Sequence, residues 1–386
     1  MSGTNARLGD LVTFLSGFAF KSQAFNSDGD GLPLVRIRDV VAGRSNTFYS
    51  GPFDTRFLVE DGDYLIGMDG EFNLARWHGG RALLNQRVCK VDKVSPVLDR
   101  HYLARFLPKA LKAIEDETPF VTVKHLSVKD LNHVTIPVPP LGEQRRIAEV
   151  LDRADDLRAK RREALTHLDD LTQSIFLDMF GNPAVNPMGL PRMPLGELIV
   201  LGPQNGLYKP SSEYGEGTPI VRIDAFYGGV MTGLAKLKRL RTDQAEIERY
   251  GLTERDILIN RVNSLEYLGK SAVVPRLEEP TVFESNMVRL RLDPSRAEAN
   301  YMIHLLQSGH IKSQIRAAAK NAVNQSSINQ ADVKALDIIL PPLAAQREFV
   351  RRADAVQQHR RRLRAGLAEL DALFASLQDR AFRGLL

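Results

Sequence analysis

Cysteine is almost absent from this chain of 386 residues, which contains only Cys89. A single cysteine cannot form an internal disulfide, and it cannot supply the set of thiolates that binds structural zinc. The eight histidines show no metal-ligand spacing either. We therefore expect no metal chemistry in this chain.

Long apolar runs are also missing. No stretch of about 18 apolar residues occurs, and Met1 to Asp10 has neither the basic start nor the apolar core of a signal peptide. We expect no membrane span and a cytoplasmic location. The length allows two to three domains, and 43% hydrophobic with 26% charged residues is typical of globular proteins.

The charge balance is mildly basic, with a net charge of +5 and a sequence pI near 9.2. This balance suits a polyanionic partner but is common among unrelated proteins. Much of the excess lies in two arginine-rich segments: Arg145, Arg146, Arg153, Arg158, Arg161, Arg162, and Arg360, Arg361, Arg362, Arg364. Two interpretations stay open. We favour a solvated helix face paired with acidic residues over direct phosphate contact.

One long internal repeat organises the sequence. Val138–Arg145 (VPPLGEQR) returns as Leu340–Arg347 (LPPLAAQR), 202 positions later, and the same offset matches Leu171 to Leu373 without a gap. Solenoid proteins repeat every 20 to 50 residues or so, and a period near 200 therefore indicates two whole units of domain plus helix. Such a chain can present two similar domains to a two-fold partner such as duplex DNA.

Each copy of the repeat begins a long helical pattern. Apolar residues recur at alternating three- and four-residue steps along Glu143–Phe180 and along its copy, as in a coiled coil. We expect the two apolar seams to pack on each other or to bind a partner. Ala344-Ala345 and Gly366 predict a second helix that is less regular or packs differently. The predicted seam residues are Ile147, Ala154, Leu157, Leu168, Leu171, Ile175, Val356, Leu363, Leu370, Leu373 and Leu377.

The two proline pairs mark the boundaries where a globular domain meets its helix, because proline cannot continue a strand ladder and disfavours helix before it. Gly181-Asn182-Pro183 predicts the end of the first helix, and Pro187–Pro194 predicts a linker. The resulting domain limits are 1–137 and 188–339 for two globular domains, and 138–187 and 340–386 for two helical segments.

The globular segments resemble each other loosely. Pro33–Ile37 matches Pro219–Ile223, and Gly62–Ile66 matches Arg255–Ile259, all with a strand-like pattern. Each domain ends with an amphipathic helix, expected over Tyr102–Ile114 and Tyr301–Ala319, and a short extended piece, Val134–Val138 or Ala335–Leu340. The fold class we predict is mixed α/β, with two pseudo-repeated domains joined by two long antiparallel coiled-coil helices.

These residues resemble the specificity subunit (HsdS) of type I restriction-modification systems over essentially the whole chain. The stretches that carry the resemblance are Gly67–Phe72, Ala75–Trp77, Thr122–Leu131, Pro139–Ala148, Leu171–Phe176, Asn260–Ser264 and Phe283–Met287. The resemblance implies two target recognition domains, each reading one half of a split DNA site. It also implies two antiparallel helices that hold these domains apart and bind two methyltransferase subunits.

The length of the predicted helix agrees with such a role. Glu143–Phe180 would extend about 57 Å at 1.5 Å per residue, whereas one turn of DNA is about 34 to 36 Å long. A rigid helix of this length can set the distance between two half-sites, and spacing then becomes part of specificity.

DNA bases are read by arginine or lysine at guanine edges and by asparagine or glutamine at adenine edges. Trp77 could stack on DNA, although a lone tryptophan after short strands is more often a core residue. Lys124 and Lys320, near the domain-to-helix boundaries, are candidate phosphate contacts. The DNA-binding candidates are Asn73, Arg76, Trp77, His78, Arg81, Gln86, Arg87 and Lys124, and Asn260, Arg261, Asn263, Lys270, Asn286 and Lys320.

Catalytic motifs do not emerge from the sequence. Adenine methyltransferases place Asn or Asp before Pro-Pro and an aromatic residue after it, whereas here Val138 and Leu141 flank the first pair. Gly269-Lys270-Ser271 ends like a phosphate-binding loop, but Ser264 stands where the first glycine is required. We expect no cofactor in this chain. The resemblance implies S-adenosylmethionine in the methyltransferase partner, and ATP and Mg²⁺ in the restriction partner.

Two functions of different class remain. We favour a non-catalytic DNA-specificity subunit over a coiled-coil scaffold whose globular ends bind proteins. DNA binding that depends on salt distinguishes the two.

Overall fold

The computed structural model describes residues 4–118, 124–322 and 325–386. Thr122 and Val123, from the stretches that carry the resemblance, lie outside the described residues. The chain forms two compact units, Met1–Glu163 with Leu363–Leu386, and Ala164–Arg362. Each unit contains one globular domain and part of both long helices. The domain limits given above remain a prediction.

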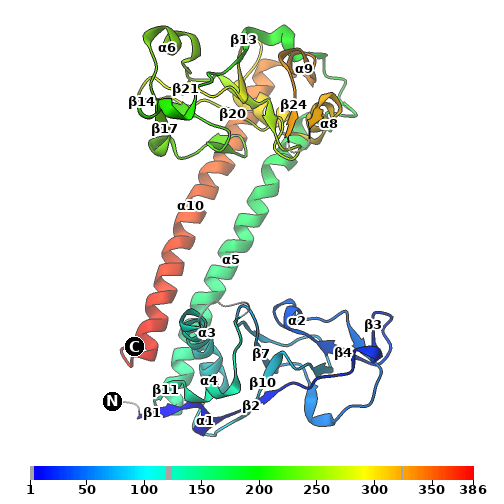
Figure 1. Cartoon of the computed structure of the whole chain (residues 1–386), viewed down its shortest axis with the longest axis vertical. Coiled ribbons are helices and arrows are strands. Elements are labelled where there is room, and N and C mark those ends of the chain that lie inside the picture. Colours follow the sequence, from blue (N-terminus) through cyan, green and yellow to red (C-terminus); the bar gives the residue numbers. More distant parts are fainter. Residues whose placement is uncertain (1–3, 119–123, 323–324) are drawn as a thin grey trace. The chain divides into compact units, whose positions relative to one another are not determined.

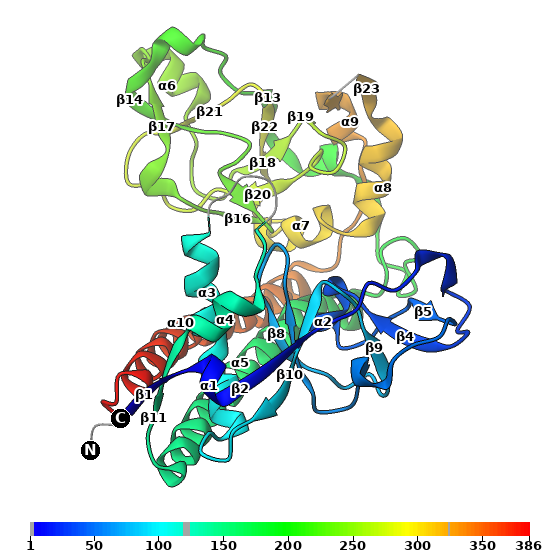
Figure 2. The same cartoon turned by 60° about the horizontal axis from the view of Figure 1, so that its bottom comes forward.

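The first unit is a mixed α/β structure built on two small sheets and the antiparallel strand pair β1-β11 (Figures 1 and 2). The antiparallel sheet β2-β10-β7-β8 lies between helices α3 and α4 on one side and the sheet β3-β5-β4-β9-β6 on the other. The strands of the first unit are β1 (Thr4–Arg7), β2 (Val12–Ser16), β3 (Phe25–Asn26), β4 (Leu32–Val35), β5 (Phe48–Tyr49), β6 (Leu58–Val59), β7 (Tyr64–Gly67), β8 (Leu74–Arg76), β9 (Ala82–Leu84), β10 (Val88–Val94) and β11 (Thr135–Val138). Its short helices are α1 (Leu8–Leu11), α2 (Ile37–Ala42), α3 (Arg100–Glu117) and α4 (Val128–His133).

The second unit repeats this plan. Its sheet β13-β22-β18-β20 has the same order of equivalent strands, and β12 pairs with β25 as β1 pairs with β11. Its strands are β12 (Arg192–Pro194), β13 (Ile199–Asn205), β14 (Tyr214–Val221), β15 (Phe226–Tyr227), β16 (Val230–Met231), β17 (Lys238–Leu240), β18 (Ile257–Asn260), β19 (Val262–Asn263), β20 (Ser271–Val273), β21 (Val282–Phe283), β22 (Met287–Leu292), β23 (Lys320–Ala322), β24 (Gln325–Ser327) and β25 (Asp337–Ile339). Its short helices are α6 (Gln244–Tyr250), α7 (Ala299–Leu306), α8 (Gly309–Ala318) and α9 (Gln330–Lys334). The predicted mixed α/β pseudo-repeat is therefore confirmed.

One predicted helix is interrupted. The segment Tyr301–Ala319 forms two helices, α7 and α8, because Ser308 caps a new helix and its hydroxyl accepts a hydrogen bond from the Ile311 N–H. A serine side chain competes for backbone donors in this way and favours a helix start over a helix interior.

The two long helices are α5 (Leu141–Phe180) and α10 (Leu343–Phe382), each of 40 residues. The expectation of a less regular second helix is wrong. Glycine supplies the backbone hydrogen bonds that a helix needs, and at Gly366 a Cβ atom would lie 3.4 Å from the Arg161 guanidinium. Within the first unit the helices run antiparallel, because Arg158 pairs with Asp371 at 2.6 Å while Arg161 lies beside Gly366, earlier in α10.

The predicted apolar seam is only partly buried. Arg158 fills part of the contact in the first unit, where its guanidinium lies 4.3 Å from the centre of the Phe374 ring. The prediction of seam burial is wrong for Leu157, Leu171 and Leu373, which are exposed. Partner binding by these three residues stays a prediction. The buried members are Ile147, Ala154 and Val356, and the half-buried ones are Leu168, Ile175, Leu363, Leu370 and Leu377.

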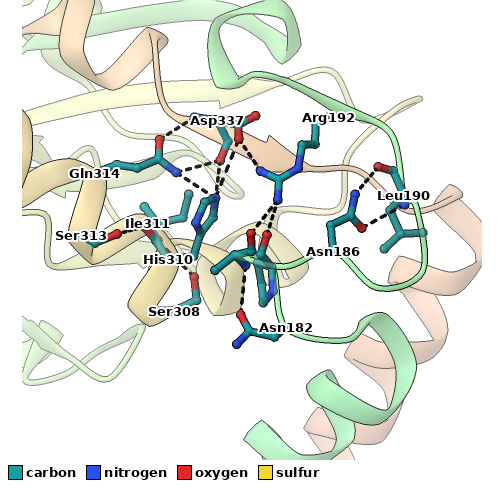
Figure 3. Close-up of polar contacts among 12 residues, drawn as sticks. Asn182, Asn186, Leu190, Arg192, Ser308, His310, Ile311, Ser313, Gln314 and Asp337 are labelled. Atoms are coloured by element: carbon teal, nitrogen blue, oxygen red, sulfur yellow. Dashed lines mark hydrogen bonds and ion pairs between the residues drawn. The ribbon is translucent and has the colours of Figure 1, made fainter.

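The segment after α5 leads into strand β12, which pairs with β25 in a two-stranded sheet of the second unit. Arg192 Nη2 donates to the Pro183 carbonyl at 2.7 Å, and its Nη1 pairs with Asp337 at 2.5 Å (Figure 3). The Gln314 amide donates to the Asp337 carbonyl and accepts from its N–H. The predicted linker over Pro187–Pro194 is thus wrong at its C-terminal end, because strand β12 lies there and pairs with β25.

The repeated glutamine explains why the Pro-Pro motif occurs twice. Gln144 is fully buried, its Oε1 accepts from the Asp99 N–H at 2.7 Å, and its Nε2 donates to the carbonyls of Val97 and Pro139. In the second unit Gln346 repeats all three bonds, with the Glu298 N–H and the carbonyls of Arg296 and Pro341. Each glutamine therefore attaches the start of a long helix to its globular domain through main-chain groups.

Replacing Gln346 by alanine should destabilise the second unit by about 2 to 4 kcal/mol, because main-chain groups that lose their partners keep their desolvation cost. Urea unfolding followed by circular dichroism measures this loss. Gln358, exposed on the same helix, is the matched control. Equal midpoints for Gln346→Ala and Gln358→Ala would contradict the expectation.

An aromatic cluster forms the core where the long helices meet the second domain. Phe349 is fully buried and packs edge-on against Phe176 and Phe180, with ring centroids at 5.4 and 5.7 Å. The His304 ring lies 5.0 Å from Phe349, and burial lowers the pKa of His304 to about 4. His304 is therefore neutral at pH 7 in the folded chain.

This histidine should make the second unit sensitive to acid. Its pKa is about 6.5 when unfolded and lower when folded, so between these values the unfolded state binds the additional proton. The stability is fully present above about pH 6.5 and is lost as the pH falls toward 4, by about 2 kcal/mol between pH 7 and pH 5. Urea unfolding at both values, compared with His304→Gln, measures the loss. An equal loss in the variant would rule His304 out as its cause.

Candidate nucleic-acid interface

Three chain segments meet at one point in each unit, at or beside the ends of strands, and we call this point the loop junction. The first junction comprises residues 67–70, 86–88 and 124–126. The Met68 N–H donates to the Arg87 carbonyl at 3.0 Å, and the Leu126 N–H donates to the Met68 carbonyl at 2.8 Å. Main-chain bonds therefore fix how the three segments cross.

The second junction comprises residues 260–263, 285–287 and 326–328 and has the same bonds. The Arg261 N–H donates to the Asn286 carbonyl, and the Ile328 N–H donates to the Arg261 carbonyl, both at 2.9 Å. A capping-box helix follows each junction directly, α4 with Ser127 at its N-cap and α9 with Asn329. The two units thus hold residues at corresponding positions on equivalent backbone.

The first junction carries a charged cluster. Asp69 Oδ1 lies 2.7 Å from His125 Nδ1, and Asp69 Oδ2 lies 3.2 Å from Arg87 Nε. Arg87 Nη1 also donates to Asp69 Oδ1 at 3.4 Å. The side chains of Arg87 and His125 are 51% and 53% exposed, whereas that of Asp69 is 24% exposed. The carboxylate therefore orients two side chains that face solvent.

The second junction is uncharged at the same positions. The positions of Asp69, Arg87 and His125 in the first unit correspond to Val262, Asn286 and Ser327 in the second. The strand pairing gives this correspondence, because Val262 pairs with Ser327 as Asp69 pairs with His125. Asn286 is half-buried. The Arg261 guanidinium turns back and donates to the Ser285 carbonyl at 3.0 Å. The two junctions thus share a backbone and differ in chemistry.

The structure brings some predicted candidates to the junctions. Gln86 and Arg87 belong to the first junction, and Arg261, Asn263 and Asn286 belong to the second. Lys320 in β23 pairs with Ser327 of β24. The other exposed candidates of the first domain lie in β8 and in the segments directly before and after it: Asn73, Arg76, His78 and Arg81. Arg76 lines a pocket with Arg105, Asp152 and Asp155.

Two residues predicted as DNA-binding candidates, Trp77 and Asn260, lie in the core of their domains. Both are 0% exposed, and the Trp77 Nε1–H donates to the Gly80 carbonyl at 2.6 Å. Neither side chain can reach a base from the core of its domain. For Trp77 the structure confirms the core position that the sequence favoured over stacking on DNA. The selection of Asn260 was wrong because a short strand, here β18, does not reveal which of its polar residues faces inward.

Lys124 and Lys270, two of the predicted DNA contacts, bind groups of their own domains. The Lys124 ammonium donates to the Glu115 carbonyl in the last turn of α3. Lys270 Nζ donates to the Ile223 carbonyl at 2.5 Å and lies 3.9 Å from the centre of the Tyr227 ring. Burial lowers the pKa of Lys270. Both ammonium groups therefore have an acceptor within their own domain, and DNA contact by either lysine stays a prediction.

Asp69, His125 and Ser327 are junction residues that were not among the predicted site residues. The available signal was the offset of 202, which matches His125 to Ser327. Among the described residues, no group of three or more His, Cys, Asp or Glu side chains could hold a metal ion. A helix long and apolar enough to cross a membrane is likewise absent from the part of the chain that the structure describes.

Comparison with known proteins gives consistent matches. The family model described as "Type I restriction modification DNA specificity domain" matches residues 4–167 and 193–368. The chain is 28% identical to the Type I restriction enzyme EcoBI specificity subunit of Escherichia coli, over 97% of this chain and 84% of that protein. It is 24% identical to the StySPI specificity subunit of Salmonella potsdam, over 99% of this chain and 88% of that protein.

Two solved structures have the same fold. One is the S subunit of a type I restriction-modification system from M. genitalium, with a TM-score of 0.57, 14% identity, and coverage of 98% of this chain and 96% of that one. The other comes from work on complex assembly and conformational transition of a type I system, with a TM-score of 0.62, 20% identity, and coverage of 100% and 98%. These likenesses concern the fold.

Proposed function

This chain belongs to the family of type I restriction modification DNA specificity domains, and from that membership we propose that it selects the DNA sequence on which a type I restriction-modification complex acts. Each unit reads one half of a bipartite site in double-stranded DNA. The observation that carries the proposal is the loop junction, which has the same main-chain bonds in both units and different side chains. A protein that reads two different half-sites with one fold needs this combination.

Catalysis belongs to partner subunits in this proposal. Two methyltransferase subunits bind S-adenosylmethionine and methylate adenine, and restriction subunits that join the complex use ATP and Mg²⁺ for cleavage. The two similar long helices support the binding of two methyltransferase subunits, because Leu171 and Leu373 are exposed at matching positions of the repeat. Each leucine would contact one methyltransferase subunit.

A coiled-coil scaffold whose globular ends bind proteins is the alternative left open by the sequence. The family match does not favour it, since it covers most of both globular domains. A scaffold also has no need for the exposed Arg87, which the fold orients through Asp69.

The proposal predicts DNA binding that weakens steeply with salt. With six or more phosphate contacts, affinity should fall by about a thousandfold or more between 50 and 200 mM salt. Fluorescence anisotropy of the full chain with its methyltransferase subunits, on a labelled duplex, measures this dependence. The duplex carries the motif found by sequencing methylated adenines in cells with and without the gene. No preference for this duplex over a scrambled one would support the scaffold.

A further inference from the structure

We propose that the two loop junctions read different bases: Arg87 reads a guanine in one half-site, and Asn286 reads an adenine in the other. This inference rests on the proposed DNA-specificity function and assigns base chemistry to its two sites. It follows from the position of the two residues, the polar groups around them, and the bases that these side chains match.

The two residues occupy equivalent positions. Arg87 directly precedes β10 and Asn286 directly precedes β22, the second strands of the two matching sheets. Their carbonyls accept equivalent hydrogen bonds, from the N–H groups of Met68 and Arg261. Because the same crossing fixes the backbone in both units, the side chains leave it at the same place in each domain.

Arg87 has the geometry of a guanine reader. Asp69 Oδ2 lies 3.2 Å from Nε, Asp69 Oδ1 accepts a hydrogen bond from Nη1 at 3.4 Å, and His125 Nδ1 lies 3.5 Å from Nη1. The planar group has five N–H donors, so the edge formed by Nη1 and Nη2 keeps donors for a ligand. Two parallel donors match O6 and N7 of guanine in the major groove. The half-exposed Arg87 side chain can present this edge to DNA.

Asn286 has the complementary chemistry for adenine. A carboxamide can accept from N6 of adenine and donate to N7. At the second junction Val262 and Ser327 bring no charge near this amide. The arginine of this junction, Arg261, is turned back onto the Ser285 carbonyl. Asn263 Oδ1 at this junction accepts a hydrogen bond from the Ser264 N–H, and the carboxamide that occupies the position of Arg87 is that of Asn286.

Asp69 is a positioning residue in this account. Its carboxylate accepts hydrogen bonds and cannot donate one when ionised, so it would repel phosphates and the acceptor edge of guanine. It is the least exposed member of the charged cluster and contacts both Arg87 and His125. Its role is to restrict the orientations of Arg87 before DNA arrives, which lowers the entropy cost of binding.

The test measures base preference at every position of the motif. The probes are duplexes that carry the methylated motif with one base pair replaced at a time, titrated with the full chain in complex with its methyltransferase subunits. Arg87→Ala should lose about tenfold to hundredfold discrimination at one G·C pair of one half-site. Asn286→Ala should lose similar discrimination at one A·T pair of the other half-site. Arg38→Ala, an exposed arginine of the same domain as Arg87, should leave every preference unchanged.

Two further variants separate base reading from charge and from folding. Arg87→Lys keeps the charge but not the planar fork, and it should lose discrimination at the same G·C pair while retaining affinity for scrambled DNA. Asp69→Asn should reduce that discrimination while affinity for scrambled DNA rises, because a negative charge is removed. A misfolded domain would lower both quantities.

The outcomes distinguish the inference from the function on which it rests. Failure of the wild-type complex to prefer its motif over a scrambled duplex would defeat the proposed function. A wild-type preference that Arg87→Ala and Asn286→Ala leave unchanged in rank order would defeat the inference alone. A uniform loss on all duplexes, with a salt slope reduced by about one, would identify Arg87 as a phosphate contact and also defeat it.

Discussion

Inserting one heptad into each long helix, after Leu165 and after Leu367, is expected to add about three base pairs between the two half-sites. Seven residues lengthen a helix by about 10.5 Å at 1.5 Å per residue and preserve the apolar pattern. Base pairs lie about 3.4 Å apart. The bases within each half-site should stay the same, because the insertion touches neither loop junction.

The helical twist of DNA also affects the spacing that is observed. Three base pairs also rotate the second half-site by about 100°, given about 10.5 base pairs per turn. Sequencing of methylated adenines in cells that carry the insertion reports both spacing and bases. Seven residues inserted after Asp28, in an exposed turn of the first domain, provide the control and should leave the spacing unchanged. Altered bases at an unchanged spacing would falsify the role of the helices as a ruler.

Replacing Leu171 and Leu373 together by aspartate is expected to abolish recruitment of methyltransferase subunits. The two leucines are 40% and 50% exposed, so the change should not unfold the chain. In the complex each aspartate would be buried without a partner at a cost of several kcal/mol, which corresponds to a loss of affinity of more than about a hundredfold.

The single variants sharpen this prediction. Each of them should retain one methyltransferase subunit of two, which light scattering after size-exclusion chromatography detects as an intermediate mass. Val185→Asp, at an exposed apolar residue outside the repeat, is the matched control and should form the complete complex. A double variant of unchanged complex mass would show that the partner binds elsewhere.

The repeat allowed much of the fold to be predicted before any coordinates. A matched Pro-Pro pair and an ungapped helical pattern predicted both long helices, and the structure gives the physical reason in Gln144 and Gln346. The break at Ser308 was missed because the apolar periodicity continues across it. Leu157 was misjudged because periodicity cannot show that Arg158 fills the contact in its place.

The candidate site was harder to predict than the fold. Asp69 and His125 lie 56 positions apart in sequence, and only the folded loops bring them within 2.7 Å. Lys270 was selected for its charge, but its ammonium faces a carbonyl and aromatic rings of its own domain. Composition identifies side chains able to bind DNA, whereas the orientation of each one depends on contacts that are distant in sequence.

The buried glutamines have a consequence for how this protein can evolve. Each one attaches its domain solely through main-chain N–H and C=O groups. Any domain that presents the same backbone can therefore form these three bonds, provided that its apolar side chains also pack against the start of the helix, as Tyr301 does against Phe349. Recombination within the two similar coding segments for the Pro-Pro motif could exchange whole domains while the attachment is kept. New combinations of half-sites would then arise in one genetic event, without the gradual accumulation of point mutations.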